Sequence, residues 1–236
     1  MLRLLDEIGD ISTLPPDVTP LSPPQSVGED VDYTLLLEAT DSVTEDQWDE
    51  TIAILEQRMP SARSGVHLAW VSVGQAEVRL SAHTLTVGQA IALATPKGHF
   101  AIIERKCESD PCDAEGAYVD KPTGLTNTDI ESASFGTSYL TGAPIILFQM
   151  THAGAQVLAD ITTRLFDTNV YGGTPDQMAF ALDGAMLVSR VVSSPVYGGA
   201  GSIYGDFTEE EAQVIAALIA SPLPPVALRL VSAETR

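Results

Sequence analysis

Apolar residues near the two ends of the chain recur with helix and strand spacings, and the order of these segments is the strongest constraint on the fold. In chain order they read as a strand, a helix and two strands, and later a helix and a strand, at 33–39, 44–59, 67–73, 77–81, 208–221 and 226–232. A β-α-β-β order completed later by α-β is typical of a ferredoxin-like split βαβ fold. The sequence therefore predicts an α+β protein with a ferredoxin-like base.

The long interval between these two groups predicts a large insertion. The base is expected to comprise 31–82 and 206–236, and the inserted α+β head subdomain 83–205. Within the head, the pattern predicts strands near 99–105 and 144–150, a helix at 153–166, and a hairpin whose two strands flank Asp183-Gly184. Residues 86–94 fit a short helix or an irregular connection, a polar loop is expected up to about 128, and 125–133 is expected to form a short helical turn.

Local signals fix where two of the helices begin. Thr44 with Gln47, and Thr208 with Glu211, have the spacing of a capping box, in which each side chain bonds the other's backbone amide. Both tryptophans, Trp48 and Trp70, are expected in the core.

Residues 1–30 are predicted to form a flexible tether. Five prolines fall within ten positions of this segment, at 15, 16, 20, 23 and 24, so it fits neither a helix interior nor a central strand. It is either a stalk or an ordinary disordered N-terminus. Met1–Asp10 lacks the apolar run of a secretory signal, and the promising apolar stretch 214–231 is interrupted by prolines. The protein is therefore cytoplasmic, or a signal or anchor lies upstream of this chain.

Charge excludes two classes of partner. The 236-residue chain carries 32 Asp plus Glu against 12 Lys plus Arg, a formal charge of −20. Nucleic-acid binding depends on cationic side chains that replace the counterions of phosphates, and anionic membranes attract basic surfaces. We expect no nucleic acid and no peripheral binding to an anionic bilayer.

The only two cysteines, Cys107 and Cys112, flank Asp110-Pro111, whose turn propensity favours a disulfide between them. Such a bridge requires an oxidising compartment, and the alternative is a pair of free thiols in a surface loop. A zinc site is not expected, because the four histidines are scattered along the chain.

Motifs for chemistry are weak throughout. The glycine loop 199–205 leads into a strand and has the wrong spacing for a nucleotide fingerprint. No Gly-x-Ser-x-Gly nucleophile elbow occurs, and the acidic residues around Asp110 lack the calcium-loop pattern. We predict no catalytic, cofactor-binding or metal-ligating residues, and therefore no enzyme. A small hydrolase without a recognised motif would need carboxylate, histidine or serine side chains that converge in a cleft.

The C-terminal third carries a resemblance to a known family. Its run Ala181-Leu-Asp-Gly, followed by Ser194-Pro-Val, Gly198-Gly-Ala-Gly-Ser-Ile-Tyr-Gly-Asp-Phe-Thr208 and Glu209-Glu-Glu-Ala212, is similar to the matching stretch of SecD proteins. The chain resembles the large first extracytoplasmic domain of SecD, a protein-export subunit, including its head subdomain. SecD has membrane helices on both sides of this domain, and no such span is predicted here.

The resemblance implies a non-enzymatic, extracytoplasmic accessory of protein export, held by an anchor outside this chain. It would bind unfolded or emerging polypeptide, or a component of the Sec translocon. The family's head swings relative to its base, so the expected crossings, Ala82-His83-Thr84 and Gly205-Asp206, are candidate hinges or ordinary linkers. A stand-alone ligand-binding or structural module of the cell envelope is the alternative.

Overall fold

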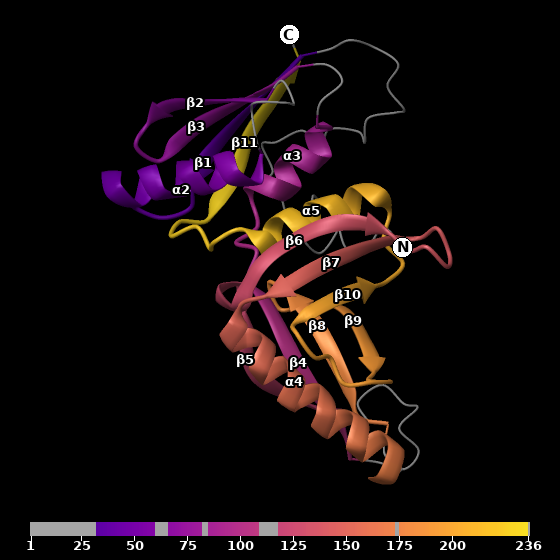
Figure 1. Ribbon diagram of the computed structural model, residues 1–236. Helices are drawn as coiled ribbons and strands as arrows, with labels where there is room; N and C mark the ends of the chain where they lie inside the picture. Colours follow the sequence, from indigo (N-terminus) through magenta and orange to yellow (C-terminus); the bar gives the residue numbers. More distant parts are fainter. Residues whose placement is uncertain (1–31, 60–65, 82–84, 109–117, 173–174, 236) are drawn as a thin grey trace. The chain divides into compact units, whose positions relative to one another are not determined.

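The chain folds into two compact units that alternate along the sequence. The computed structural model describes residues 32–59, 66–81, 85–108, 118–172 and 175–235 (Figure 1). Unit 1 contains the chain up to Lys97 and again from Pro224, and unit 2 is Gly98–Leu223. The predicted tether at 1–30 lies outside the described residues.

Unit 1 is built on a four-stranded antiparallel sheet in the order β11-β1-β3-β2. Its elements are β1 Tyr33–Ala39, α2 Glu45–Arg58, β2 Val66–Ser72, β3 Gln75–Leu80, α3 Val87–Ala94 and β11 Leu228–Thr235. The strands and α2 are those predicted from the hydrophobic pattern, with ends shifted by a few residues. The ambiguous segment 86–94 is helical, and Thr86 and Gln89 close a capping box at its start.

The core of unit 1 forms where the apolar faces of helix and sheet meet. Trp48 and Leu55 of α2, and Leu35 and Leu37 of β1, are fully buried. The predicted capping box of α2 is confirmed, because the backbone amide of Gln47 donates to the Thr44 hydroxyl while Thr44 N–H donates to the Gln47 side chain. One cap and one apolar face therefore position α2.

Trp70 corrects one expectation. Its side chain is 56% exposed rather than buried. The residue lies near the hairpin end of β2, which is an edge strand of its sheet, and burial falls along this strand from Val66 onward. Strand periodicity assigns a residue to a face, but it does not say how far along the strand that face is covered.

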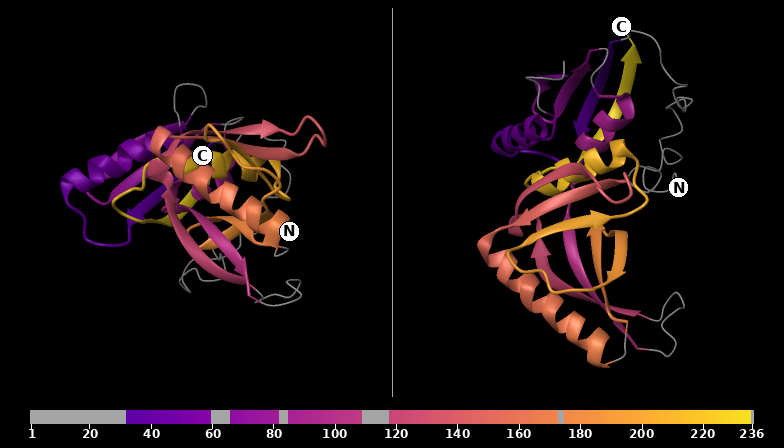
Figure 2. Two further views of the ribbon diagram at one scale, coloured as in Figure 1. Left: turned by 60° about the horizontal axis from the view of Figure 1, so that its bottom comes forward. Right: turned by 45° about the vertical axis from the view of Figure 1, so that its right-hand side comes forward.

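Unit 2 contains two antiparallel sheets and two long helices (Figures 1 and 2). One sheet has the order β10-β7-β6, and the other has the order β5-β4-β8-β9. The elements are β4 Phe100–Cys107, β5 Tyr118–Thr126, η3 Asn127–Asp129, β6 Ile130–Thr137, β7 Pro144–Met150, α4 His152–Asp167, η4 Thr168–Gly172, β8 Gln177–Leu182, β9 Ala185–Val191, β10 Ala200–Tyr204 and α5 Glu209–Ala220.

Three predicted features of unit 2 are confirmed. The strand expected at 144–150 is β7, the central strand of its sheet, but it is not buried on both faces, because Leu147 is 39% exposed. The helix expected at 153–166 is α4. The β8–β9 hairpin turns at Asp183 and Gly184, whose φ angles of 49° and 84° are both positive, as a type I′ turn requires.

Two strands were not predicted. The segment expected to be a polar loop contains β5, and the segment expected to be a helical turn holds only the short 3₁₀ helix η3 before β6 begins. Both are edge strands. β5 carries Asp120, Lys121 and Pro122, residues that protect an edge from further pairing and that weaken the usual strand signal.

The assignment of the last helix to the base is wrong. α5 belongs to unit 2, where it packs on β6 and β7 (Figure 1). Six of its apolar residues are buried: Ala212, Val214, Ile215, Ala216, Leu218 and Ile219. The predicted base therefore loses this helix, and its limits at 82/83 and 205/206 differ from those of the compact units. The amphipathic pattern correctly predicted the helix but could not say which sheet it covers.

One buried side chain joins the elements of unit 2. The amide nitrogen of Asn127 lies 2.9 Å from the Gly98 carbonyl oxygen and 3.2–3.4 Å from those of Leu218, Ile219 and Ser221. Its Oδ1 accepts the Phe100 amide at 2.8 Å. Asn127 is 8% exposed, so this one side chain satisfies polar groups that water scarcely reaches at the start of β4 and the end of α5.

We predict that Asn127→Ala destabilises unit 2 by about 2 kcal/mol, because buried peptide groups lose their partner. The exchange rate of the Phe100 amide hydrogen, measured by NMR, should rise accordingly. Tryptophan fluorescence is not a suitable probe, since both tryptophans lie in unit 1. Thr128→Ala, at the exposed neighbouring position, serves as control. Equal exchange in the two variants would contradict the assigned role.

Candidate functional site

The three-stranded sheet of unit 2 is almost free of charge, although the chain carries a formal charge of −20. No Asp, Glu, Lys or Arg occurs in 132–159 or in 191–205. These two segments supply β7, β10 and all of β6 after Glu131. Because β6 and β10 both pair with β7, the two uncharged segments lie side by side in one sheet.

The outer face of this sheet exposes apolar groups between small residues. Residues opposite one another on an antiparallel ladder share a face. The rows on this face are Tyr204–Ile145–Gly136, Ser202–Leu147–Ser134 and Ala200–Gln149–Ser132. Tyr204 is 51% exposed and Leu147 39%. A Cβ at Gly136 would come within 2.8 Å of Leu147 Cδ1, so glycine leaves the room that this leucine occupies.

The opposite face belongs to the core. Ile146 and Met150 of β7 and Ile203 of β10 are buried. Phe148 lies on the same side, and its ring packs on that of Phe180 of β8 with centroids 5.9 Å apart. The strands are therefore fixed by packing on one side, while on the other side Leu147 and Tyr204 remain exposed and Ile145 is buried.

The hairpin between β6 and β7 presents two further apolar side chains. Tyr139 is 90% exposed and Leu140 77%. The turn that carries them is hydrogen-bonded: Ser138 N–H donates to the Ala143 carbonyl oxygen at 2.9 Å, and Gly142 N–H donates to that of Ser138 at 2.8 Å. We call Tyr139, Leu140, Leu147 and Tyr204 the apolar surface of unit 2.

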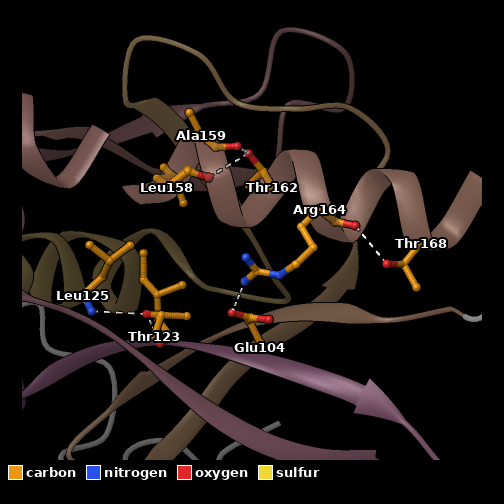
Figure 3. A network of polar contacts seen from close by, with 9 residues as sticks. Glu104, Thr123, Leu125, Leu158, Ala159, Thr162, Arg164 and Thr168 are labelled. Carbon is orange, nitrogen blue, oxygen red and sulfur yellow. Dashed lines mark hydrogen bonds and ion pairs between the residues drawn. The ribbon is translucent and has the colours of Figure 1, made fainter. Parts of the chain in front are cut away.

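A polar network anchors α4 to the second sheet (Figure 3). The Arg164 guanidinium on α4 pairs with Glu104 of β4, whose side chain is only 3% exposed. Glu104 Oε2 has no partner among the residues the structure describes. The Thr162 hydroxyl accepts the amide of Val196 at 2.9 Å and donates to the Leu158 carbonyl oxygen at 2.8 Å. These contacts position α4 and the loop before β10.

The residue types that ligate metal ions do not gather into a metal site in the described regions. Across residues 32–235, outside the gaps given above, no group of three or more His, Cys, Asp or Glu is placed to hold a metal ion. Cys107, at the end of β4, is disulfide-bonded. Cys112 lies outside the described residues, so its pairing with Cys107 stays a prediction.

The candidate hinges fall in different places. Ala82, His83 and Thr84 lie outside the described residues. Gly205 and Asp206 lie inside unit 2, between β10 and α5, and not where the chain passes between the units. Those passages are at 97/98 and 223/224.

On the side of unit 1, a buried arginine holds the chain just before the first passage. Arg58, the last residue of α2, is 2% exposed. Its Nη1 donates to the carbonyl oxygens of Leu93 at 3.3 Å and Pro96 at 2.8 Å, and its Nη2 donates to that of Lys97 at 2.6 Å. The chain is therefore fixed to α2 up to Lys97.

On the side of unit 2, the chain is fixed from Gly98 onward. The Asp183 carboxylate accepts the amides of Gly98 at 3.0 Å and His99 at 2.8 Å, and Asn127 accepts that of Phe100. Sequence reasoning missed these roles. Asp183 was predicted only as a turn residue, and Arg58, which follows Glu56 and Gln57 at the end of a helix, has no sequence feature that separates it from an exposed arginine.

The family follows from a comparison with family models. The model described as SecDF, P1 head subdomain, matches residues 104–224, which is just over half of the chain and nearly coincides with unit 2. The chain belongs to this family. The resemblance seen in the C-terminal third is thereby confirmed and extends back to residue 104.

Comparison with curated proteins also gives SecD proteins as relatives. The chain is 32% identical over 147 residues to protein translocase subunit SecD of Acidaminococcus fermentans, an alignment that covers 62% of this chain and 30% of that protein. It is 24% identical over 204 residues to SecD of Leptotrichia buccalis, with 86% and 46% covered. The chain thus spans between about a third and a half of these SecD proteins.

Solved SecDF structures share the fold. A super-membrane-facing form of SecDF matches with a TM-score of 0.64 at 19% identity, over 86% of this chain and 30% of that one. A second chain, from work on a membrane component SecDF that enhances protein export, matches with a TM-score of 0.58 at 17% identity, over 84% and 98%. No helix in the described part of the present chain has the length and apolarity to cross a bilayer.

One carboxyl group of unit 1 has a shifted pKa. Arg229 on β11 lies opposite Glu38 on β1, and its Nη2 donates to Glu38 Oε2 at 2.6 Å. This hydrogen bond, assisted by one from Gln75 at 3.2 Å, lowers the pKa of Glu38 below its ordinary value. The depressed pKa has a structural cause, a cross-strand pair on the sheet, and indicates no acid–base chemistry.

We predict that Arg229→Gln raises the pKa of Glu38 toward its ordinary value. Because the folded-state pKa is depressed, the pair stabilises the fold above the unfolded-state pKa, and this contribution is lost as the pH falls through the folded-state pKa. An NMR titration of the Glu38 side-chain carboxyl carbon measures the shift. Arg79→Gln removes a pair with Glu77 instead and should leave Glu38 unchanged. An unaltered titration of Glu38 in Arg229→Gln would refute the assignment.

Proposed function

We propose that this chain is a non-enzymatic, extracytoplasmic accessory of protein export, and that its head binds emerging polypeptide on the apolar surface of unit 2. Family membership supports a place in the SecD/SecDF system, and a SecDF protein of the same fold is described as enhancing export. The observation that carries the proposal is a sheet whose one charged residue is Glu131, with exposed Tyr139, Leu140, Leu147 and Tyr204, on a chain of charge −20.

The chemistry of the surface suits an unfolded chain. Polypeptides in transit differ in sequence and charge, but all of them expose apolar side chains that a folded protein would bury. A binding surface with no ionised groups repels neither acidic nor basic segments. Exposed tyrosine and leucine offer contact area at little entropic cost, since few side-chain torsions become fixed.

Unit 1 supports the proposal as the base of the head. We assign it as ferredoxin-like, because β1-α2-β2-β3-α3-β11 with sheet order β11-β1-β3-β2 follows the split βαβ plan. Its second helix is then α3 and not α5. The whole of unit 2 is inserted between α3 and β11.

The proposal also covers the compartment in which the chain works and its protein partner. An extracytoplasmic position, with an anchor outside this chain, accords with a Cys107–Cys112 bridge, which persists only in an oxidising compartment. A component of the Sec translocon is the proposed protein partner, because the curated relatives are translocase subunits.

We also relocate the proposed hinge to the two passages between the units. Arg58 fixes the chain before Gly98, and Asp183 and Asn127 fix it afterwards, so rotation is confined to the junction itself. The return passage contains Pro222, Pro224 and Pro225. Hinges are usually a few residues between stiff bodies, as these passages are.

We predict that Tyr139→Ser combined with Leu140→Ser weakens binding of an unfolded polypeptide about tenfold or more, because two exposed apolar anchors are lost. Fluorescence anisotropy with a labelled, reduced and carboxymethylated protein measures the affinity. The matched control is Val71→Ser with Val73→Ser, which removes two exposed apolar residues from a hairpin of unit 1.

Equal losses in the two variants would show that the contacts are non-specific. Absence of binding by the unaltered chain would overturn the proposal and favour a structural module of the envelope.

We predict that Pro222→Gly with Pro225→Gly broadens the distribution of distances between a dye on α2 and a dye on α4, measured by single-molecule energy transfer. Glycine removes the φ restriction of proline at exposed positions. Asp206→Gly, at the hinge position expected from sequence, should leave the distribution unchanged because it lies within unit 2. The reverse pattern would return the hinge to 205–206.

A further inference from the structure

β10 is an edge strand with an unusual composition. Six strands form the edges of the described sheets: β2, β5, β6, β9, β10 and β11. Natural edge strands usually carry charges or prolines that prevent another strand from pairing with them. β5, β6, β9 and β11 each contain at least one charged residue, and β2 contains a histidine. β10, with the sequence Ala-Gly-Ser-Ile-Tyr, has none of these.

The backbone of β10 offers hydrogen bonds at its free edge. Met150 N–H donates to the Gly199 carbonyl oxygen at 3.0 Å, which fixes the phase of the ladder between β10 and β7. Peptide groups alternate in direction along an antiparallel strand. Those of Gly201 and Ile203 therefore point toward β7, and those of Ala200, Ser202 and Tyr204 point away. No other described strand pairs with that edge.

We propose that the free edge of β10 binds an extended segment of unfolded polypeptide as an added strand of the β10-β7-β6 sheet. The inference rests on the proposed function and specifies its binding mode. Main-chain hydrogen bonds to Ala200, Ser202 and Tyr204 give affinity that is independent of sequence. Alternate side chains of the segment lie beside the outer face, next to Tyr204, and this position favours apolar and aromatic residues.

Charge selects this occupant over a second copy of the protein. Two copies joined edge to edge would bring together chains of −20 each, and like charges oppose association. The uncharged segment 191–205 imposes no such cost on a neutral or basic peptide. Apolar segments of unfolded chains also have the β propensity that an added strand requires.

The test uses the whole chain and a fluorescent ten-residue peptide rich in valine and threonine. Ser202→Pro removes an outward N–H and places a ring at the edge, whereas Ser202→Thr keeps the amide. A second peptide carries N-methyl groups on two adjacent central residues, which blocks main-chain pairing along both of its edges while every side chain is retained. Anisotropy gives the affinities, and circular dichroism checks that the variants are folded.

We expect about tenfold weaker binding for Ser202→Pro and for the N-methylated peptide, from the loss of one or two hydrogen bonds, and unchanged binding for Ser202→Thr. If Ser202→Pro is misfolded, the N-methylated peptide on the unaltered chain decides alone. Equal affinity for both peptides overturns edge pairing and leaves the proposed function standing. No binding of any unfolded polypeptide overturns both. If the unaltered chain forms a dimer and Ser202→Pro does not, the strand that pairs with β10 comes from a second copy and not from a peptide, which overturns the proposal.

Discussion

The architecture of unit 2 depends on the requirement that buried peptide groups be hydrogen-bonded. The Asn127 side chain meets this requirement for the first residues of β4 and the last residues of α5 together. These segments are about 120 positions apart in sequence, and they are also where the chain enters and leaves unit 2. Asp183 adds two further bonds at Gly98 and His99. A large insertion can thus be a compact body with both of its ends held at one place.

A strongly acidic chain can present a neutral surface because its charged residues and its uncharged strands occupy different segments of the sequence. One face of this sheet packs into the core through Ile146 and Phe148 of β7 and Ile203 of β10, while Leu147 and Tyr204 on the outer face remain exposed. All of the acidic residues lie outside the segments 132–159 and 191–205. A surface that contacts chains of any charge is then compatible with a net charge that opposes self-association.

Much of the fold was predictable because its signals are local. The capping boxes at Thr44 and Thr208 fixed two helix starts, Asp183-Gly184 fixed a hairpin, and the apolar run 144–150 indicated a central strand. β5 was missed because an edge strand with Lys121 and Pro122 lacks the apolar alternation of a strand. The exposure of Trp70 was missed because burial depends on where α2 and the neighbouring strands end. The candidate surface was not predicted, since two separate uncharged segments form one sheet only through pairing with β7.

By itself, the sequence determined the type and order of most elements, the acidic charge that disfavours nucleic acid, and a resemblance to SecD that the family comparison bore out. These properties are carried by neighbouring residues or by sums over the chain. The tertiary structure alone decided that α5 packs on β6 and β7, that the passages lie at 97/98 and 223/224, and that β10 is an open edge. Each of these depends on contacts between residues distant in sequence, and an amphipathic pattern records that a face is buried without recording its partner.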